Sequence, residues 1–490
     1  MAADGSSTAI TDLTQDSLVH CATYLNRRDI SNLASTCKYL NRVAYSDSIW
    51  QRLSRELWPS HIPLSFPNTM SVREAYLARH TALRQLKFID PLVSHFYTEA
   101  KPFDHLLLDR NHILFSQGSL VRLVKIDSFL SGRDGLVTLS DHRARISCMR
   151  LFPLSDTSFF RNETQRDDNV LVTASCDHSI RLWWKGSCQR CFRGHNAPVT
   201  VLSDKLLGDN NSGKILASGG LDGTVRLWSL SSSGKRGQHA LKATLYGHEK
   251  PIVFMSTAGH KNSILVSLSR DSKVRVWDTT ASSATRSTSC VGETKVVGSP
   301  VGMKCQGPIV YIAAGTSVVA IDLRTMQRAF TAETHLSKLC SFDIVASKHL
   351  LCTGGIDRAM IWDIRRSSET PKTQPIAELD GHYGPITQLH MDPYKVVTGT
   401  STDLFVKVWD SATGVPTNSL ICSTSSGNHG CCAMAVDGCR IVTGVCEEEQ
   451  GLLTYWDFGN ATCPVSSRLG ESDSKFWGPL SSIDSDESDY

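Results

Sequence analysis

The sequence has no long apolar run and no strong excess of either charge. Among its 490 residues, no uninterrupted apolar stretch approaches the ~18 residues of a membrane-spanning helix. The first residues, Met1–Ser7, lack the basic and apolar regions of a signal peptide. The net charge is only +3 with both signs interspersed, which excludes the basic footprint of a nucleic-acid-binding protein. We therefore expect a protein of the cytoplasm, the nucleus or both, without nucleic-acid or membrane partners and with its sixteen cysteines reduced.

Motifs for cofactors and metals are also scarce. The sequence contains no P-loop and no dinucleotide-binding fingerprint, so we expect no cofactor. Cys188 and Cys191 form one CxxC pair close to His195. A structural zinc site usually needs four ligands, and no second CxxC pair exists. We interpret the two cysteines as small residues of a strand, with a metal site as the alternative.

Tryptophan, by contrast, recurs at a steady interval. Its positions 183, 228, 277, 362, 409 and 456 are 45, 49, 85, 47 and 47 residues apart, and 85 is close to two periods. A His, a Ser or Thr, and an Asp precede four of these tryptophans in the same order. The four sets are His195, Ser218, Asp222, Trp228; His248, Ser267, Asp271, Trp277; His335, Thr353, Asp357, Trp362; and His382, Thr398, Asp403, Trp409. A period of ~40–45 residues with Gly-His at its start and Trp-Asp at its end resembles the WD repeat of β-propellers.

The repeated residues can form a chain of hydrogen bonds inside each blade. The His donates one ring N–H to the Asp, and its other ring nitrogen accepts from the Ser or Thr hydroxyl, which itself accepts the indole N–H. A His–Asp–Ser set also fits a hydrolase, but an active site does not recur in register around a ring. We therefore expect a structural network and no enzyme.

Two degenerate units complete the count of blades. Residues 309–322 keep the hydrophobic pattern of two strands and a turn, and place Ile321-Asp322 where Trp-Asp is expected. Residues 112–127 do the same with Ile126-Asp127. The fold class is therefore mainly β, a WD-repeat propeller over residues 104–463. Eight blades agree best with the spacing, and seven are the alternative.

Residues 9–56 change to a helical period. Apolar residues recur every three or four positions around Leu18 and again around Ile30, with Asp29 and Ser46-Asp47 as helix caps, which predicts three short helices. The segment resembles the F-box at Leu13, Leu18, Leu25, Ile30 and Trp50, which the resemblance makes the adaptor-binding residues. It departs from the family at Thr14, where proline is usual and would pre-set the start of the helix. Asp12 or Thr14 could cap the helix instead.

The remaining segments are a linker and two tails. Residues 57–103 read as a helical linker, in which Ser71 and Glu74 form a capping box. Residues 1–8 form an N-terminal tail, and residues 464–490 are rich in serine and acidic residues, a composition typical of disorder.

Taken as a whole, the chain resembles the F-box/WD-repeat family, and within it a plant member. The resemblance implies the substrate-recognition subunit of an SCF-type (Skp–cullin–F-box) ubiquitin ligase. The F-box would bind the Skp-family adaptor, and through it a cullin, while the propeller would bind an unknown substrate protein. The alternative is a WD-repeat scaffold protein with a vestigial F-box and no ubiquitin role, which Thr14 would favour if it abolished adaptor binding.

The substrate would meet the propeller on the rim where the His loops and Asp turns come together. The candidate residues beside them are Arg143, Arg145, Lys250, Arg270, Lys338, Arg358 and Tyr383, with Glu447–Glu449 at the eighth turn. Cations on one rim favour an acidic or phosphorylated peptide. Solvated loop charges are the alternative, because charged loops commonly stay in water.

Overall fold

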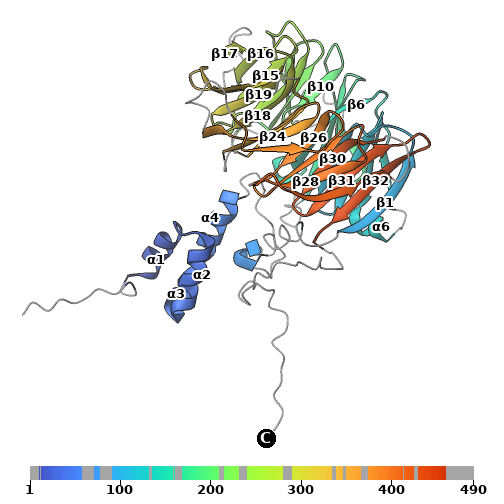
Figure 1. Cartoon of the computed structure of the whole chain (residues 1–490). Helices are drawn as coiled ribbons and strands as arrows, with labels where there is room; N and C mark the ends of the chain where they lie inside the picture. The colour runs from blue at the N-terminus through green and yellow to red at the C-terminus, as the bar shows by residue number, and fades with distance from the viewer. Residues whose placement is uncertain are drawn as a thin grey trace, which may run out of the picture. The chain divides into compact units, whose positions relative to one another are not determined.

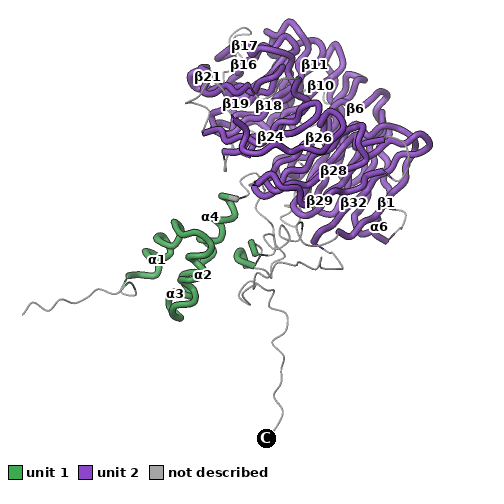
Figure 2. Tube along the Cα trace, in the orientation of Figure 1, with its two compact units in different colours: residues 1–90, 461–490 green, residues 91–460 purple. Residues whose placement is uncertain are grey.

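The computed structural model divides the chain into two compact units (Figure 2). One consists of residues 1–90 with 461–490, and the other of residues 91–460. The structure describes residues 10, 13–57, 71–74, 76–77, 86, 91–131, 135–157, 159–160, 168–208, 214–230, 240–279, 290–333, 338–345, 349–365, 374–411, 413–423 and 429–459. Both predicted tails and His335 lie outside the described residues. None of the described helices is long and apolar enough to cross a membrane.

Residues 13–57 form four short helices rather than the three expected. They are α1 (Gln15–Ala22), α2 (Arg27–Thr36), α3 (Lys38–Ala44) and α4 (Asp47–Leu57). Thr14 caps α1, because its hydroxyl accepts the backbone N–H of Ser17 at 3.4 Å. The cap of α2 is Asn26 and not Asp29, since the Asn26 side chain accepts the backbone N–H of Asp29 at 2.9 Å. The prediction failed here because both residue types cap helices and only the backbone geometry selects between them.

The segment after residue 70 joins this helical unit. Ser71 and Glu74 form the expected capping box, in which each backbone N–H donates to the other side chain at 2.9 and 3.3 Å. The ring of Tyr76 then packs on Trp50, with centroids 5.2 Å apart. This part of the predicted linker therefore belongs to the core of the helical unit.

The second unit consists of eight four-stranded antiparallel sheets, which are the blades of a β-propeller. The first four in chain order are β2 (His105–Asp109), β3 (His112–Gln117), β4 (Leu120–Lys125), β5 (Val137–Leu139); β6 (Ile146–Pro153), β7 (Asn169–Ser175), β8 (Ser179–Trp184), β9 (Ser187–Arg193); β10 (Val199–Leu202), β11 (Ile215–Gly220), β12 (Val225–Ser229), β13 (Leu241–Leu245); and β14 (Ile252–Thr257), β15 (Ile264–Ser269), β16 (Lys273–Asp278), β17 (Cys290–Lys295). The helix α6 (Ile126–Leu130) follows β4, and the 3-10 turn η2 (Leu154–Asp156) follows β6.

The other four sheets complete the ring. They are β18 (Pro300–Gln306), β19 (Ile309–Ala314), β20 (Ser317–Asp322), β21 (Arg328–Glu333); β22 (Ser341–Val345), β23 (Leu350–Gly354), β24 (Arg358–Asp363), β25 (Ala377–Asp380); β26 (Ile386–Met391), β27 (Lys395–Thr400), β28 (Phe405–Asp410), β29 (Pro416–Ile421); and β30 (Cys431–Asp437), β31 (Arg440–Cys446), β32 (Gln450–Asp457) with β1 (Leu92–Glu99). Both degenerate units form full blades, so eight blades are confirmed over seven.

The last blade is closed by a strand from the beginning of the unit. β1 pairs antiparallel with β32 from Leu92↔Asp457 to Glu99↔Gln450, and Figure 1 shows the two side by side. The prediction placed residues 92–99 in the helical linker and began the propeller at 104. It was wrong there, because the alternating exposure of β1 marks an outer strand whose partner lies some 350 residues away. Such pairing removes the free edges at which a ring would open.

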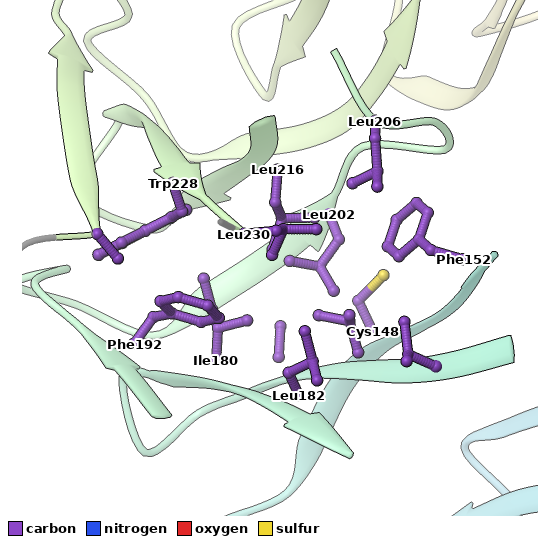
Figure 3. Close-up of a cluster of buried hydrophobic side chains, with 14 of the residues drawn as sticks. Cys148, Phe152, Ile180, Leu182, Phe192, Leu202, Leu206, Leu216, Trp228 and Leu230 are labelled. Carbon is purple, nitrogen blue, oxygen red and sulfur yellow. The ribbon is translucent and has the colours of Figure 1, made fainter. Parts of the chain in front are cut away.

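The cores lie between successive blades. Middle strands such as β11 and β12 are buried almost throughout, while the outer strand β17 alternates between half-buried and exposed residues. Figure 3 shows one core, in which Phe152, Ile180 and Phe192 of one blade pack against Leu202 and Trp228 of the next. Because each blade buries its face against its neighbour, the rim loops are held by a rigid frame.

Candidate functional site

The helical unit separates the predicted adaptor-binding residues into core and surface. Leu18, Ile30 and Trp50 are buried, and the Trp50 indole donates to the carbonyl of Ala44 at 2.8 Å. These three residues therefore hold the unit together instead of offering a surface to a partner. Leu25 is half-buried. Of the five, only Leu13 is exposed, at 48%.

Three of the four exposed large apolar side chains described in this unit lie around α1, and the fourth is Tyr45 at the end of α3. The three are Ile10, Leu13 and Tyr24, the last of which is 73% exposed. The Tyr39 hydroxyl donates to the Leu13 carbonyl at 2.9 Å and so fixes the chain just before α1. The Tyr24 ring lies edge-on to His20, with centroids 5.5 Å apart. Apolar side chains held in place but exposed are suited to burial against a partner.

Two of the predicted propeller sets form complete hydrogen-bond chains. His195 Nδ1 lies 3.0 Å from Asp222, and its Nε2 lies 2.8 Å from the Ser218 hydroxyl, which accepts the Trp228 indole at 2.8 Å. The His382 set repeats this geometry, at 2.9 Å to Asp403, 2.8 Å to Thr398 and 2.8 Å from Trp409 to Thr398.

A further complete set is not among the four that the sequence pattern assigned in full. His142 lies 3.0 Å from Asp177 and 2.7 Å from Thr173, which accepts the Trp183 indole at 2.8 Å. His142 follows Asp141 instead of a glycine, and it lies 35 residues before its Asp, so the Gly-His signature did not find it. The spacing of Trp183 from Trp228 is the signal that could have revealed it.

The predicted His248 set is incomplete. His248 Nε2 lies 2.7 Å from Ser267, which accepts the Trp277 indole at 2.8 Å. The predicted bond to Asp271 is missing, and His248 Nδ1 is buried with no hydrogen-bond partner among the described residues. Asp271 instead accepts the backbone N–H of Lys273 at 3.0 Å. The prediction failed because matching residue types do not fix the position of a turn.

The imidazoles of His195, His248 and His382 are held in their neutral form. Burial lowers the pKa of His195 and of His382, and lowers that of His248 to about 4. Burial works in the opposite direction for Asp177, but hydrogen bonds from His142 and Ser179 outweigh it and hold the pKa of this carboxyl below its usual range. A neutral His with a charged Asp is the pairing that a structural network needs.

The His loops and Asp turns meet on one rim, as expected. Besides the His–Asp contacts, the backbone N–H of Cys176, Leu221 and Arg270, each just before a turn Asp, donates at 2.9 Å to the carbonyl of Arg145, Pro198 and Pro251. Each acceptor lies three residues after a His of the network. Side chains beside these loops therefore share one face of the propeller.

Some of the predicted rim cations form ion pairs, and the others form none among the residues that the structure describes. Arg145 donates to Asp104 at 2.6 Å, and Arg358 contacts Glu378 at 2.7 Å as well as Asp357 and Asp380, so neither is free to bind a substrate as predicted. Arg143, Lys250, Arg270 and Lys338 are exposed. Tyr383 is 92% exposed. Sequence could not foresee the pairs with Asp104, Glu378 and Asp380, because these carboxylates come from other segments of the chain.

One of the glutamates predicted at the eighth turn is not an open rim residue. Glu447 is buried and accepts the Ser423 hydroxyl at 2.8 Å, unlike the exposed Glu448 and Glu449.

The CxxC pair of Cys188 and Cys191 lies on the strand β9. Within the described part of the chain, no group of three or more His, Cys, Asp or Glu side chains is placed to hold a metal ion.

The two units match two known domain families. Residues 15–56 match the F-box-like family. Residues 133–183, 186–229, 240–278 and 373–410 match the family of the WD domain, G-beta repeat. The domains are those of an F-box/WD-repeat protein. Both domains of an F-box/WD-repeat protein are typically non-catalytic interaction domains, and no catalytic family is indicated.

Curated relatives resemble this F-box/WD-repeat protein over part of its length. Nuclear distribution protein nudF of Aspergillus niger is 29% identical over 143 residues, which cover 29% of this chain and 28% of that protein. Ribosome biogenesis protein ytm1 of the same fungus is 27% identical over 282 residues, covering 49% and 55%. Striatin-3 of Rattus norvegicus is 32% identical over 127 residues, covering 22% and 15%. The chain thus spans about half or less of these relatives.

A solved structure supports the fold. The computationally designed Ika8 protein aligns with 74% of the F-box/WD-repeat chain and 97% of its own, at a TM-score of 0.53 and 19% identity. At that identity the likeness concerns the fold alone.

Proposed function

We propose that this chain is the substrate-recognition subunit of an SCF-type ubiquitin ligase. The F-box binds the Skp-family adaptor, and through it a cullin, while the propeller binds the substrate protein. Such a receptor performs no covalent chemistry. It raises the effective concentration of its substrate beside the ligase's conjugating enzyme.

The observation that carries the proposal is the apolar surface around α1. A unit of four short helices buries little surface by itself, yet it leaves Leu13 and Tyr24 exposed. The competing scaffold hypothesis rests on Thr14 in place of the family's proline. Because the Thr14 hydroxyl accepts the Ser17 N–H, α1 begins with a capped turn despite this departure. This supports an F-box whose first helix is intact despite the threonine at position 14.

Co-purification with the Skp-family adaptor tests the proposal. We expect Leu13→Glu and Tyr24→Glu to abolish adaptor binding, because each puts a charge into the apolar contact, while the melting temperature stays unchanged. Tyr383→Glu is the matched control, since Tyr383 is an exposed tyrosine of the propeller. If both F-box variants retain the adaptor as well as the wild type, the ligase assignment fails and the scaffold alternative stands.

For the substrate, we propose an acidic or phosphorylated segment docked on the propeller rim. The exposed Arg143, Lys250, Arg270 and Lys338 supply positive charge there, and Tyr383 supplies an aromatic surface. Lys250→Glu with Arg270→Glu should release the substrate without affecting adaptor binding, and the wild-type interaction should weaken steeply with salt. Retention of the substrate by that double variant would move its binding site elsewhere on the propeller.

A further inference from the structure

A pocket of about 620 Å³ lies beside the turn between β15 and β16. Three separate segments line it: the turn Arg270–Ser272, the residues Lys295–Ser299 at and after the end of β17, and Arg328 at the start of β21. It therefore lies where the blade β14–β17 meets the blade β18–β21.

The blade β18–β21 has neither the network His in its loop nor the network Asp in its turn, and this leaves room for the pocket. Val297 occupies the position that His248 occupies in the preceding blade, since each lies three residues before a proline, Pro300 or Pro251. The His248 side chain is buried, whereas Val297 is 75% exposed. Between β19 and β20 only Gly315 and Thr316 remain, where other blades have the longer Asp turn. No side chain of the network therefore bridges the loop and the turn here.

Backbone forms one wall of this gap. Gly298 has φ +99°, and a Cβ placed on it would lie 2.7 Å from the Cα of Gly315. The loop thus approaches the turn more closely than a larger residue permits. The Ser272 hydroxyl donates to the Gly298 carbonyl and fixes the loop from the other side.

The side chains around the gap carry an excess of positive charge. Arg270, Lys295 and Arg328 line the pocket, against the single carboxylate of Asp271. Lys295 lies directly opposite Lys273 in the β16–β17 register, and like charges at that position are unfavourable. Lys273 has Glu293 at 3.8 Å, whereas no ion pair involves Lys295 within the described residues. A bound anion would offset this repulsion.

One of these cations, Arg328, is also held in position. Arg328 donates from one guanidinium nitrogen to the Lys295 carbonyl at 3.1 Å, which leaves its other N–H groups for a ligand. The fork of N–H groups on Arg matches the oxygen spacing of a phosphate, and Lys adds a point charge. Ser299 adds an exposed hydroxyl to the lining.

We propose that this pocket binds the phosphate group of a small anionic molecule. Its volume falls within the range of roughly 300–1,000 Å³ that small-molecule sites occupy. The site is distinct from the F-box surface and goes beyond the proposed ligase role. It shares only Arg270 with the substrate rim, so Lys295 and Arg328 test it independently.

Calorimetric titration of the full chain with pyrophosphate at low ionic strength tests the proposal. We expect Lys295→Met and Arg328→Met each to weaken binding on the order of tenfold, as the loss of a charge-assisted hydrogen bond should. Asp271→Asn should tighten binding, because it removes the one carboxylate of the lining. Lys242→Met is the matched control, since Lys242 is an exposed cation on β13 outside the pocket.

Three outcomes would overturn the proposal. The first is no pyrophosphate binding by the wild type. The second is an equal loss in Lys242→Met, which would show attraction to net charge alone. The third is tighter binding of a phosphoserine peptide than of pyrophosphate, with the peptide's affinity lowered by Lys295→Met. The pocket would then bind a phosphate group of a protein and not of a small molecule. Adaptor co-purification should be unchanged in all these variants, which separates this test from that of the ligase assignment.

Discussion

The Trp50 ring lies 5.2 Å from the Tyr76 ring at an angle of 59°. Trp50 comes from the F-box segment, whereas Tyr76 follows it by 26 residues in what the sequence suggested was a spacer. Burial raises the pKa of the Tyr76 hydroxyl, in keeping with its place in the core. The contact extends the F-box fold beyond the residues that carry its sequence resemblance.

Trp50→Ala should therefore destabilise the helical unit by about 3–5 kcal/mol, the usual loss for a large buried aromatic side chain. Tyr76→Ala should destabilise it as well, and the two effects should be less than additive because the rings share one contact. Thermal unfolding followed by tryptophan fluorescence measures both. Fully additive losses would show that the two rings do not stabilise each other.

Asp222→Ala and Asp271→Ala should differ although the two positions match in sequence. Asp222 pairs with His195 at 3.0 Å, so its loss leaves a buried N–H unpaired and should cost about 1–3 kcal/mol. His248 has no such bond to lose, so Asp271→Ala should cost less. Urea denaturation of the two variants measures the difference. Equal losses would contradict the distinction between the complete and the incomplete set.

Thr398→Val and Thr443→Val form a second matched pair. The Thr398 hydroxyl bonds to both His382 and Trp409, so Thr398→Val should cost about 1–3 kcal/mol. The Thr443 hydroxyl is buried without a partner in the described structure. Thr443→Val should leave the free energy of unfolding unchanged or raise it slightly. A large loss at Thr443 would contradict an unpaired hydroxyl at this position.

The protein should lose stability as the pH falls from about 6.5 to 4. His248 has a folded pKa of about 4, below its ordinary 6.5, so the unfolded state binds the extra proton within this window. Its contribution is complete above pH 6.5 and declines by at most about 1.4 kcal/mol per pH unit below it. His248→Gln should reduce the slope of unfolding free energy against pH. Identical slopes in variant and wild type would count against a buried neutral imidazole.

Arg145→Glu should lower the melting temperature, although Arg145 is largely exposed. Its partner Asp104 has a side chain only 3% exposed, and the substitution would set two carboxylates against each other. Arg143→Glu is the control, because the Arg143 side chain is exposed on the same loop. Differential scanning calorimetry of both variants tests this. An unchanged melting temperature in Arg145→Glu would return Arg145 to the candidates for substrate binding.

The period of the tryptophans determined most of the fold. Because each blade is a local unit of four strands, Ile321-Asp322 and Ile126-Asp127 could be recognised as blades without their tryptophan. The capping box at Ser71 and the cap at Thr14 were predictable for the same reason, since both depend on residues three positions apart. The helical period of residues 9–56 likewise revealed the second module.

Tertiary structure alone decided the features that depend on distant partners. The closure of the ring by residues 92–99 needs β32, and the loss of Arg145 and Arg358 as free cations needs carboxylates on other segments. Residue types could not separate Leu13 from Leu18, because an apolar side chain in a small helical unit can serve either the core or the surface. Likewise, the His248 set matches the others in composition but not in hydrogen bonding, because a bond of about 3 Å depends on loop positions that a sequence pattern does not specify.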